Sequence, residues 1–404
     1  MAATEKGVWD IQEVRDKQLA SEWSYDATDP HTMWAWGDGS AGQLGQNDAG
    51  DAYADDRSSP IQVGTNTNWA TAGGIKVDGT LWAWGMNEYG YCGQNSVNNG
   101  YSSPTQIPGT DWSAVRSGNG GVLLGTYQCQ LAVKTDGTLW MWGSNNMGNL
   151  GQNQASAQLT GFSSPTQVGT DTTWPKKEIE NKLGWMYDGR TMMAIKTDGT
   201  LWSWGWGDNG MLFHNDIVSK SSPTQVGTDT DWNNVSSKGY TSYATRTDGT
   251  LWVAGYNIDG SFGTNQGPST IYQISSPLQI PGTTWKSVMN WGSGATATKT
   301  DGTLWAMGRN EKGTLGLNDV IHRSSPTQVG TDTTWDRAAN VGKYSAGALK
   351  TDGTLWTWGT EESGQLGQNT NIINYSSPTQ VGTDTDWIDT QGGVAYSVRG
   401  IRAV

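Results

Sequence analysis

The chain has 404 residues, a formal net charge of −13 and 16% charged residues, with 56 glycines and 24 tryptophans beside only 3 phenylalanines. No run of about 18 apolar residues is present, so no membrane-spanning helix is expected. The N-terminus lacks the apolar core of a secretory signal. The acidic balance disfavours a general nucleic-acid binder, because such proteins need Lys and Arg to displace counterions from phosphate. Two cysteines and three scattered histidines predict neither a disulfide framework nor a zinc site.

Residues 1–27 precede the repetitive part of the chain and are expected to form an arm. Asp10 is a candidate N-cap with Glu13 three residues on, so a short helix is predicted from about Ile11 to Ala20. Alone, a helix of that length is marginal in water. The arm therefore needs a docking surface, and its candidate contact residues are Trp9, Ile11, Val14, Leu19 and Trp23.

This arm is similar to a recurrent N-terminal segment of virion proteins of marine tailed phages, with a Gly-Val-Trp start at Gly7 and a second tryptophan, Trp23, before the main domain. The resemblance implies docking on a neighbouring virion subunit. The alternative is an arm that packs on its own main domain.

Residues 28–404 consist of seven units that carry the same three markers. The first is the third-strand motif Trp-x-Trp-Gly or a variant of it, usually preceded by Asp-Gly-Thr-Leu; the second is Ser-Ser-Pro; the third is a tryptophan that follows a Gly/Thr/Asp stretch. These markers hold 19 of the 24 tryptophans. The first tryptophans of the seven Trp-x-Trp motifs or variants are Trp34, Trp82, Trp140, Trp202, Trp252, Trp305 and Trp356.

Each unit is predicted to contain about four short strands. Asp-Gly between β-prone runs is a strong hairpin signal, because Gly accepts the positive φ of the turn. Thr-Leu-Trp-x-Trp alternates with a period of two, and neither face is polar, so this strand is expected to be covered on both sides. Ser-Ser-Pro-Thr-Gln-Val is expected to be the outer strand, where proline is tolerated. The pattern predicts an all-β fold, a seven-bladed β-propeller of four-stranded blades with indoles packed between blades.

The repeat resembles that of the regulator of chromosome condensation (RCC1) family, and the best copies are 342–367 and 134–151. The resemblance implies a ring closed by pairing the C-terminal strands with the N-terminal blade; a frayed terminal repeat is the alternative. The second unit has few residues between Trp69 and Asp78, so it is expected to lack or shorten a strand. Longer segments in the third and fourth units, the latter Pro175–Gly184, are expected to be loops on one face of the disc.

The search for chemistry predicts a protein that is not an enzyme and that uses no cofactor or metal. The repeated Asp of Asp-Gly-Thr occupies hairpin turns, where it serves the backbone. The acidic segment from Asp48 to Asp56 could attract Ca²⁺ but lacks EF-hand spacing, so a solvated loop is expected. Lys176, Lys177 and Lys182 form a basic cluster, and Trp185, Trp206 and Trp291 lie outside the repeated tryptophan positions. Lys176, Lys177, Trp185 and Trp206 are candidate binding residues; blade packing is the alternative for the tryptophans, and a solvated loop for the lysines.

Three functions are compatible with these patterns. The leading hypothesis is a phage virion protein, on capsid or tail, that is held by its N-terminal arm to other virion subunits and presents variable loops to a host-surface protein or glycan. Without a virion, the chain is expected to be cytoplasmic. The family name suggests the second, an RCC1-like regulator or guanine nucleotide exchange factor of a small GTPase. The third is an extracellular inhibitor or glycan-binding module.

Overall fold

The computed structural model describes residues 31–47, 55–117, 129–154, 160–176, 183–185, 190–339, 341–342, 344–370, 373–392 and 396–404. Among these residues, strands are joined by turns and loops, and the single helical element is a 3-10 turn, η1, at Ile258–Gly260. No helix within these ranges is long and apolar enough to cross a membrane. The predicted helix of the arm lies outside the described residues.

The strands follow the repeat in chain order. They are β1 His31–Gly37, β2 Arg57–Gln62, β3 Leu81–Asn87, β4 Asn98–Ile107, β5 Trp112–Ser117, β6 Cys129–Lys134, β7 Leu139–Ser144, β8 Gly161–Gln167, β9 Leu183–Trp185, β10 Thr191–Ile195, β11 Leu201–Gly205, β12 Lys220–Gln225, β13 Trp232–Lys238, β14 Thr241–Arg246, β15 Leu251–Tyr256, β16 Gln273–Ile280, β17 Trp285–Asn290, β18 Gly294–Lys299, β19 Leu304–Gly308, β20 Arg323–Gln328, β21 Trp335–Ala339, β22 Ser345–Lys350, β23 Leu355–Gly359, β24 Tyr375–Gln380, β25 Trp387–Gly392 and β26 Ser397–Ala403.

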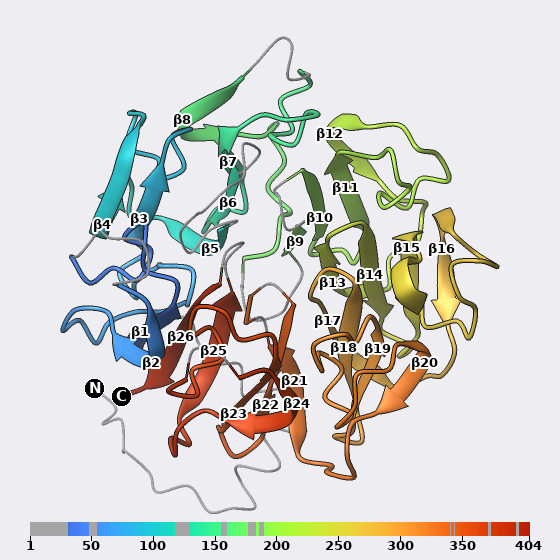
Figure 1. Cartoon of the computed structure of the whole chain (residues 1–404). Coiled ribbons are helices and arrows are strands. Elements are labelled where there is room, and N and C mark those ends of the chain that lie inside the picture. Colours follow the sequence, from blue (N-terminus) through green and yellow to red (C-terminus); the bar gives the residue numbers. More distant parts are fainter. Residues whose placement is uncertain are drawn as a thin grey trace, which may run out of the picture.

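The strands form a ring of antiparallel sheets (Figure 1). Six four-stranded blades are present: unit 1 (β25, β26, β1, β2), unit 3 (β5–β8), unit 4 (β9–β12), unit 5 (β13–β16), unit 6 (β17–β20) and unit 7 (β21–β24). Units 4 and 5 join into one eight-stranded sheet through a single pair, Ser237 opposite Trp185. The Ser-Ser-Pro strand is the outer strand of every blade, as predicted.

The prediction of seven four-stranded blades is wrong for unit 2, which is a two-stranded sheet of β3 and β4. Only isolated bridges stand where its two inner strands would be, Trp69 with Lys76 and Ile75 with Leu81. The segment between Trp69 and Asp78 is too short for a hairpin of two full strands, so the expectation of a missing or shortened strand in this unit is confirmed.

The ring is closed by strands from the two ends of the described chain. β1 pairs with β26 from His31 opposite Ala403 to Gly37 opposite Ser397, which completes unit 1. This is the predicted closure, and it pairs two sheet edges that would otherwise be free to bind other strands.

Each unit contains a basic side chain held between two tryptophans. In unit 7, the Nζ of Lys350 lies 4.8 Å from the ring centroid of Trp335 and 4.1 Å from that of Trp356, and 2.6 Å from a carboxylate oxygen of Asp332. Arg246 and Arg402 take the same place in units 5 and 1. This basic residue, which stands two positions before the Asp in units that contain Asp-Gly-Thr, thus covers indole faces. Each cation–π contact of this kind contributes about 0.5–2 kcal/mol to stability.

The second tryptophan of Trp-x-Trp links neighbouring units, as the sequence predicted. The buried indole of Trp204 donates to the carbonyl of Asn149 in unit 3 at 2.8 Å, and Trp358 donates to Thr314 in unit 6 at 2.8 Å. Trp36 donates to Gln365 in unit 7 at 2.9 Å, across the point of closure. Units 5 and 6 have Ala254 and Met307 at this position instead.

A second link recurs at all seven junctions. The asparagine that follows Gly-Gln, or takes its place, has a positive φ, between 54° and 63°, which Asn tolerates better than most residues. Its backbone amide donates to the carbonyl of the first serine of Ser-Ser-Pro in the neighbouring unit, as in Asn153 to Ser221 at 2.7 Å. Its side-chain oxygen accepts from the hydroxyl of the second serine, as in Asn153 and Ser222. Asn369 and Ser58 make this contact at the closure, so seven units form the ring although only six have four strands.

Candidate functional face

The two ends of the blades differ in what they present. At one end, the turn face, lie the Asp-Gly-Thr hairpins between second and third strands. At the other end, the loop face, lie the connections from first to second strand and from third strand to outer strand. The described residues of the variable segments after the Gly-Gln-Asn turn are therefore on the loop face.

The aspartates of the turn face are structural, as predicted. In each Asp-Gly-Thr hairpin, one carboxylate oxygen accepts from the amide and the hydroxyl of the threonine two residues on, at 2.9 and 2.7 Å for Asp136 and Thr138. These hydrogen bonds lower the pKa of Asp136, and the equivalent bonds from Thr354 lower that of Asp352. The threonine hydroxyl accepts in turn from the first indole of Trp-x-Trp. One oxygen of each carboxylate is thus committed to its own turn.

One position of the loop face varies from unit to unit while its backbone stays fixed. It follows the glycine of the Trp-x-Trp-Gly motif or its variant. In units 1, 4, 5, 6 and 7 its backbone amide donates to the connection between first and second strand, as in Trp206 to Arg190 and Tyr256 to Tyr240, both at 2.8 Å. The residues at this position are Asp38, Met86, Ser144, Trp206, Tyr256, Arg309 and Thr360. A fixed frame with variable side chains is where a propeller places specific contacts.

Four aromatic residues form a row on the loop face of units 4 and 5. Trp206 and Tyr240 pack edge to face with centroids 5.8 Å apart, Tyr240 and Tyr256 are 5.8 Å apart, and Tyr256 and Tyr272 are 5.0 Å apart. Tyr240 is 42% exposed and Tyr272 is 61% exposed. We call these four residues the aromatic row.

A cavity of about 220 Å³ lies beyond the aromatic row, between units 6 and 7. Its buried lining residues are Trp291, Thr314 and Thr360, and Arg309, Lys312 and Glu362 are among the residues around them. The backbone connects it to the row, because the turn at Gly239 is so close to Gly292 that a Cβ on Gly239 would lie 2.3 Å from the Gly292 carbonyl oxygen. Arg309 also pairs with Asp259, which follows the row residue Tyr256 by three positions, at 3.7 Å.

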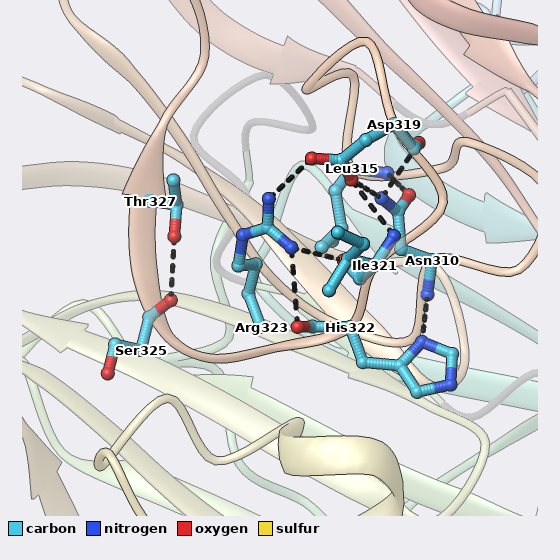
Figure 2. A network of polar contacts seen from close by, with 8 residues as sticks. All are labelled: Asn310, Leu315, Asp319, Ile321, His322, Arg323, Ser325 and Thr327. Atoms are coloured by element: carbon cyan, nitrogen blue, oxygen red, sulfur yellow. Dashed lines mark hydrogen bonds and ion pairs between the residues drawn. The ribbon is translucent and has the colours of Figure 1, made fainter.

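A polar network holds the loop that forms one side of this cavity (Figure 2). The side-chain oxygen of Asn310 accepts from the backbone amide of Leu315 at 2.8 Å, and its side-chain nitrogen donates to Asp319. The backbone amide of Asn310 donates to Nδ1 of His322 at 2.9 Å. Arg323 pairs with Asp319 and donates to the carbonyl of Ile321. The same hydrogen bond, from the backbone amide five residues on to the asparagine side-chain oxygen, is made in other units by Asn87, Asn145 and Asn257. In unit 7 the residue at this place is a glutamate, Glu361, which accepts from Leu366 at 3.0 Å.

The structure separates the binding residues that the sequence suggested. Trp206 is half-buried in the aromatic row, with the guanidinium of Arg190 5.1 Å from its ring centroid. Trp185 belongs to β9, the inner strand of unit 4, so the segment predicted as a loop supplies a strand at its end. Lys176 is exposed on the turn face, where its carbonyl accepts from Ser113. Trp291 is buried beside the cavity.

Most of the other suggested residues lie outside the described part of the chain. Lys177 and the arm residues Trp9, Ile11, Val14, Leu19 and Trp23 lie outside the described residues, as do Asp48 and Asp51 of the acidic segment. Asp56 is described and accepts from the amide of Gly39 at 3.0 Å. Within the described ranges, no group of three or more His, Cys, Asp or Glu side chains is arranged to hold a metal ion.

Sequence reasoning missed Tyr240, Tyr256, Tyr272 and the cavity. The available signal was the variable position after each Trp-x-Trp-Gly motif or variant, where Trp206 and Tyr256 are aromatic in consecutive units. Tyr240 and Tyr272 lie in connections whose length differs between units, so the repeat spacing does not predict that they contact Trp206 and Tyr256.

Comparison with known proteins confirms the repeat. The family model described as the regulator of chromosome condensation (RCC1) repeat matches residues 78–124, 198–237, 301–347 and 352–398. The chain therefore contains RCC1 repeats, and it forms a propeller, as the resemblance implied.

Curated relatives share part of the chain. The mitochondrial RCC1 domain-containing protein RUG3 of Arabidopsis thaliana is 26% identical over 272 residues, which is 65% of this chain and 58% of the relative. The X-linked retinitis pigmentosa GTPase regulator of Homo sapiens is 33% identical over 91 residues, which is 22% of this chain and 9% of the relative. The chain thus spans less than two thirds of the length of these relatives.

Solved structures share the fold over nearly the whole chain. Prp20p of Saccharomyces cerevisiae, described with its binding properties to Gsp1p and histones, superposes with a TM-score of 0.73 at 17% identity, covering 93% of this chain and 92% of that one. Human WBSCR16 superposes with a TM-score of 0.72 at 16% identity, covering 92% and 98%.

Proposed function

We propose that this protein is an RCC1-like regulator that binds a small GTPase through the loop face of units 4 to 7 and acts by binding, without a covalent reaction. The observation that carries the proposal is the aromatic row with the adjoining cavity. Aromatic side chains that are partly exposed and packed on one another are enriched at the centres of protein interfaces. The name of the human relative, a GTPase regulator, supports this class of partner.

The geometry of the aromatic row favours a protein over a glycan. A sugar ring stacks on the open face of an aromatic ring. Arg190 lies over the ring of Trp206, and Tyr240 meets Trp206 with its ring plane inclined by 69°. The row therefore presents ring edges and phenol hydroxyls more than free faces, which suits interdigitation with protein side chains.

The experiment measures binding of the full chain to a panel of purified small GTPases, each nucleotide-free and GDP-bound, by biolayer interferometry. Release of a fluorescent GDP analogue is followed in parallel. We expect one GTPase to bind and the double variant Tyr240→Ser, Tyr272→Ser to bind it at least 10-fold more weakly. Lys176→Ser on the turn face is the matched control and should bind as the wild type does.

Two results would count against the proposal. Absence of binding to every GTPase in the panel, or equal loss of binding in the turn-face variant, would remove the loop face as a GTPase-binding surface. Glycan-array binding that is lost in Trp206→Ala would favour the glycan-binding alternative.

The virion hypothesis receives no support from the relatives or from the solved structures. Attachment to other virion subunits through residues 1–27 stays a prediction. It is tested by asking whether a chain that lacks residues 1–27 still enters particles.

A further inference from the structure

The aromatic row stands on a fixed backbone frame. The backbone amide of Tyr256 donates to the carbonyl of Tyr240 at 2.8 Å, and the amide of Asn257 donates to the carbonyl of Tyr272 at 2.8 Å. Tyr240 lies in the connection from β13 to β14, Tyr256 ends β15, and Tyr272 directly precedes β16, so these tyrosines cross unit 5 from its inner strands to its outer strand. A ligand that binds along a frame of this kind orders little of the protein, which lowers the entropic cost of binding.

The spacing and inclination of the rings define the shape of the row. The ring centroids follow one another at 5.8, 5.8 and 5.0 Å, and successive ring planes are inclined by 69°, 60° and 41°. Neighbouring strands of a sheet are about 4.7–4.9 Å apart, so the spacing of the tyrosines follows from that of the strands beneath them. The row is one side chain wide and is not a flat platform. A ligand that follows it must offer small apolar groups at a matching interval.

The phenol hydroxyls of the row are available to a ligand. Tyr240 is 42% exposed and Tyr272 is 61% exposed. No hydrogen bond within the described residues uses the hydroxyl of Tyr240, Tyr256 or Tyr272. A phenol hydroxyl donates as well as accepts, so the row offers hydrogen-bond donors along its length to a ligand that has free carbonyl oxygens.

A hollow of about 460 Å³ continues the row toward the rim of the ring. Its lining begins with Gln273 and Ile274, which directly follow Tyr272 in the chain, and it also includes Pro277 and Leu278 of β16. The side chains of Ile274, Pro277 and Leu278 are half-buried, so part of the lining is apolar. The row and the hollow together form a narrow strip that suits an extended peptide segment of several residues.

Three other classes of ligand do not fit this strip. An α-helix is about 10 Å across and lays its apolar stripe into a groove, whereas the row is a single file of rings. An added β-strand pairs with a free sheet edge, whereas the row crosses the ends of strands. Single-stranded nucleic acid needs open ring faces and a cationic groove, whereas Arg190 already lies over the ring of Trp206 and the chain has a net charge of −13.

We infer that the aromatic row and the adjoining hollow bind a proline-rich peptide segment in the polyproline II conformation. This helix rises about 3.1 Å per residue, so two residues advance about 6 Å, close to the interval between the rings. It has no internal hydrogen bonds, so its carbonyl oxygens are free to accept from the phenol hydroxyls. Surfaces lined by aromatic side chains are the usual receptors of such segments. The inference goes beyond the proposed function, because it defines the ligand of the row by its chemistry and does not require that a GTPase supply it.

The test measures binding of fluorescein-labelled peptides to the full chain by fluorescence anisotropy. The probe is an oligoproline of ten L-residues. The matched probes are the same peptide made of D-proline, which has the same composition and the opposite helical hand, and a Gly-Ser peptide of equal length. In parallel, the indole N–H signal of Trp206 is followed by NMR of ¹⁵N-labelled protein and is assigned from Trp206→Phe. We expect the L-peptide to bind saturably and to shift this signal, and the two matched probes to bind at least 5-fold more weakly.

Tyr272→Ser removes an exposed ring from the row and is expected to weaken binding of the L-peptide at least 5-fold without a change in melting temperature. Tyr89→Ser is the matched control, because Tyr89 is 39% exposed on the loop face of unit 2, outside the row, and this variant should bind as the wild type does. Absence of L-peptide binding, equal binding of the two hands, or equal loss in Tyr89→Ser would each overturn the inference. The assay contains no GTPase, so this inference and the proposed function fail separately.

Discussion

The indole of Trp36 donates to the carbonyl oxygen of Gln365 at 2.9 Å, although 329 residues separate the two in the sequence. The same bond joins Trp204 to Asn149 and Trp358 to Thr314 within the ring. The junction between units 7 and 1 is therefore held by the same hydrogen bond as the junctions between units that are consecutive in the sequence.

Trp36→Phe is expected to destabilise the protein by about 2–3 kcal/mol, because it leaves a buried carbonyl without its donor and removes packing volume. Trp204→Phe should have an effect of similar size, since the bond is the same. Trp34→Phe is the control, because that indole is half-buried and donates to Thr32 in its own strand. Equilibrium unfolding in urea measures the differences, and equal stability of all three variants would contradict the role of the inter-unit bond.

Deletion of residues 388–404 is expected to lower the melting temperature by more than about 10 °C or to prevent folding. The deletion removes β26 with the buried side chains of Val398 and Ile401, and it exposes an edge of β1. Removal of Val404 alone, which is 77% exposed, should leave melting unchanged. Differential scanning calorimetry measures both, and unaltered melting of the longer deletion would argue against closure by β26.

Lys350→Arg is expected to change the free energy of unfolding by less than about 0.5 kcal/mol, because Arg246 and Arg402 already fill this place in other units. Lys350→Met should cost about 1–2 kcal/mol, because it removes the cation from between Trp335 and Trp356 and leaves Asp332 unpaired.

The pH dependence of the destabilisation caused by Lys350→Met is a second test of the ion pair between Lys350 and Asp332. The hydrogen bond from Lys350 lowers the pKa of Asp332 to about 2. A carboxyl with a lowered pKa stabilises the fold above its ordinary pKa and loses that contribution as pH falls through the lowered value. The difference between wild type and Lys350→Met should therefore shrink between pH 4 and pH 2. A difference that stays constant over this range would assign it to packing alone.

Glu361→Gln is expected to stabilise the protein at pH 8. Burial raises the pKa of Glu361 to about 7, so the folded state binds a proton that the unfolded state has released. The contribution of Glu361 to the free energy of unfolding is fully present below about pH 4.5. It decreases between pH 4.5 and 7 and is absent above pH 7, a total change of about 3 kcal/mol. Glutamine keeps the acceptor for the amide of Leu366 and cannot ionise.

Chemical denaturation at pH 5 and pH 8 measures this effect as the difference between wild type and Glu361→Gln. The difference should be small at pH 5 and largest at pH 8. A gain of equal size at both pH values would show that the carboxyl of Glu361 does not titrate in this range. Asn310→Asp, the reverse change at the same place in unit 6, should create the pH dependence that Glu361→Gln removes.

Much of the architecture follows from local patterns in the sequence. The turn at Asp136-Gly137-Thr138 is fixed by hydrogen bonds within three residues, and the alternation of Trp140 and Trp142 fixes the faces of the third strand. Because these rules act within a unit, each copy predicts its own strands. The closure was predictable because one end of the repeat lacked the strands that the other end supplied.

The aromatic row and the cavity depend on contacts between units, and no local rule determines them. Trp206 meets Tyr240 only because units 4 and 5 lie side by side and both connections project from the same face. The inner strand of unit 4 was missed for a related reason. Trp174 occupies the place where other units begin that strand, but here the strand is the short β9, Leu183–Trp185, whose residues carry none of the repeated markers.

The pairing of β1 with β26 also sets the order in which the protein can be completed during synthesis. β1 leaves the ribosome long before its neighbour in the sheet, which ends at Ala403. At roughly 5–20 residues per second, the first blade waits on the order of 20–70 s for its missing half. During that interval β1 keeps an unpaired edge, so nascent chains on one polysome can exchange this strand, and chaperone protection should matter most there.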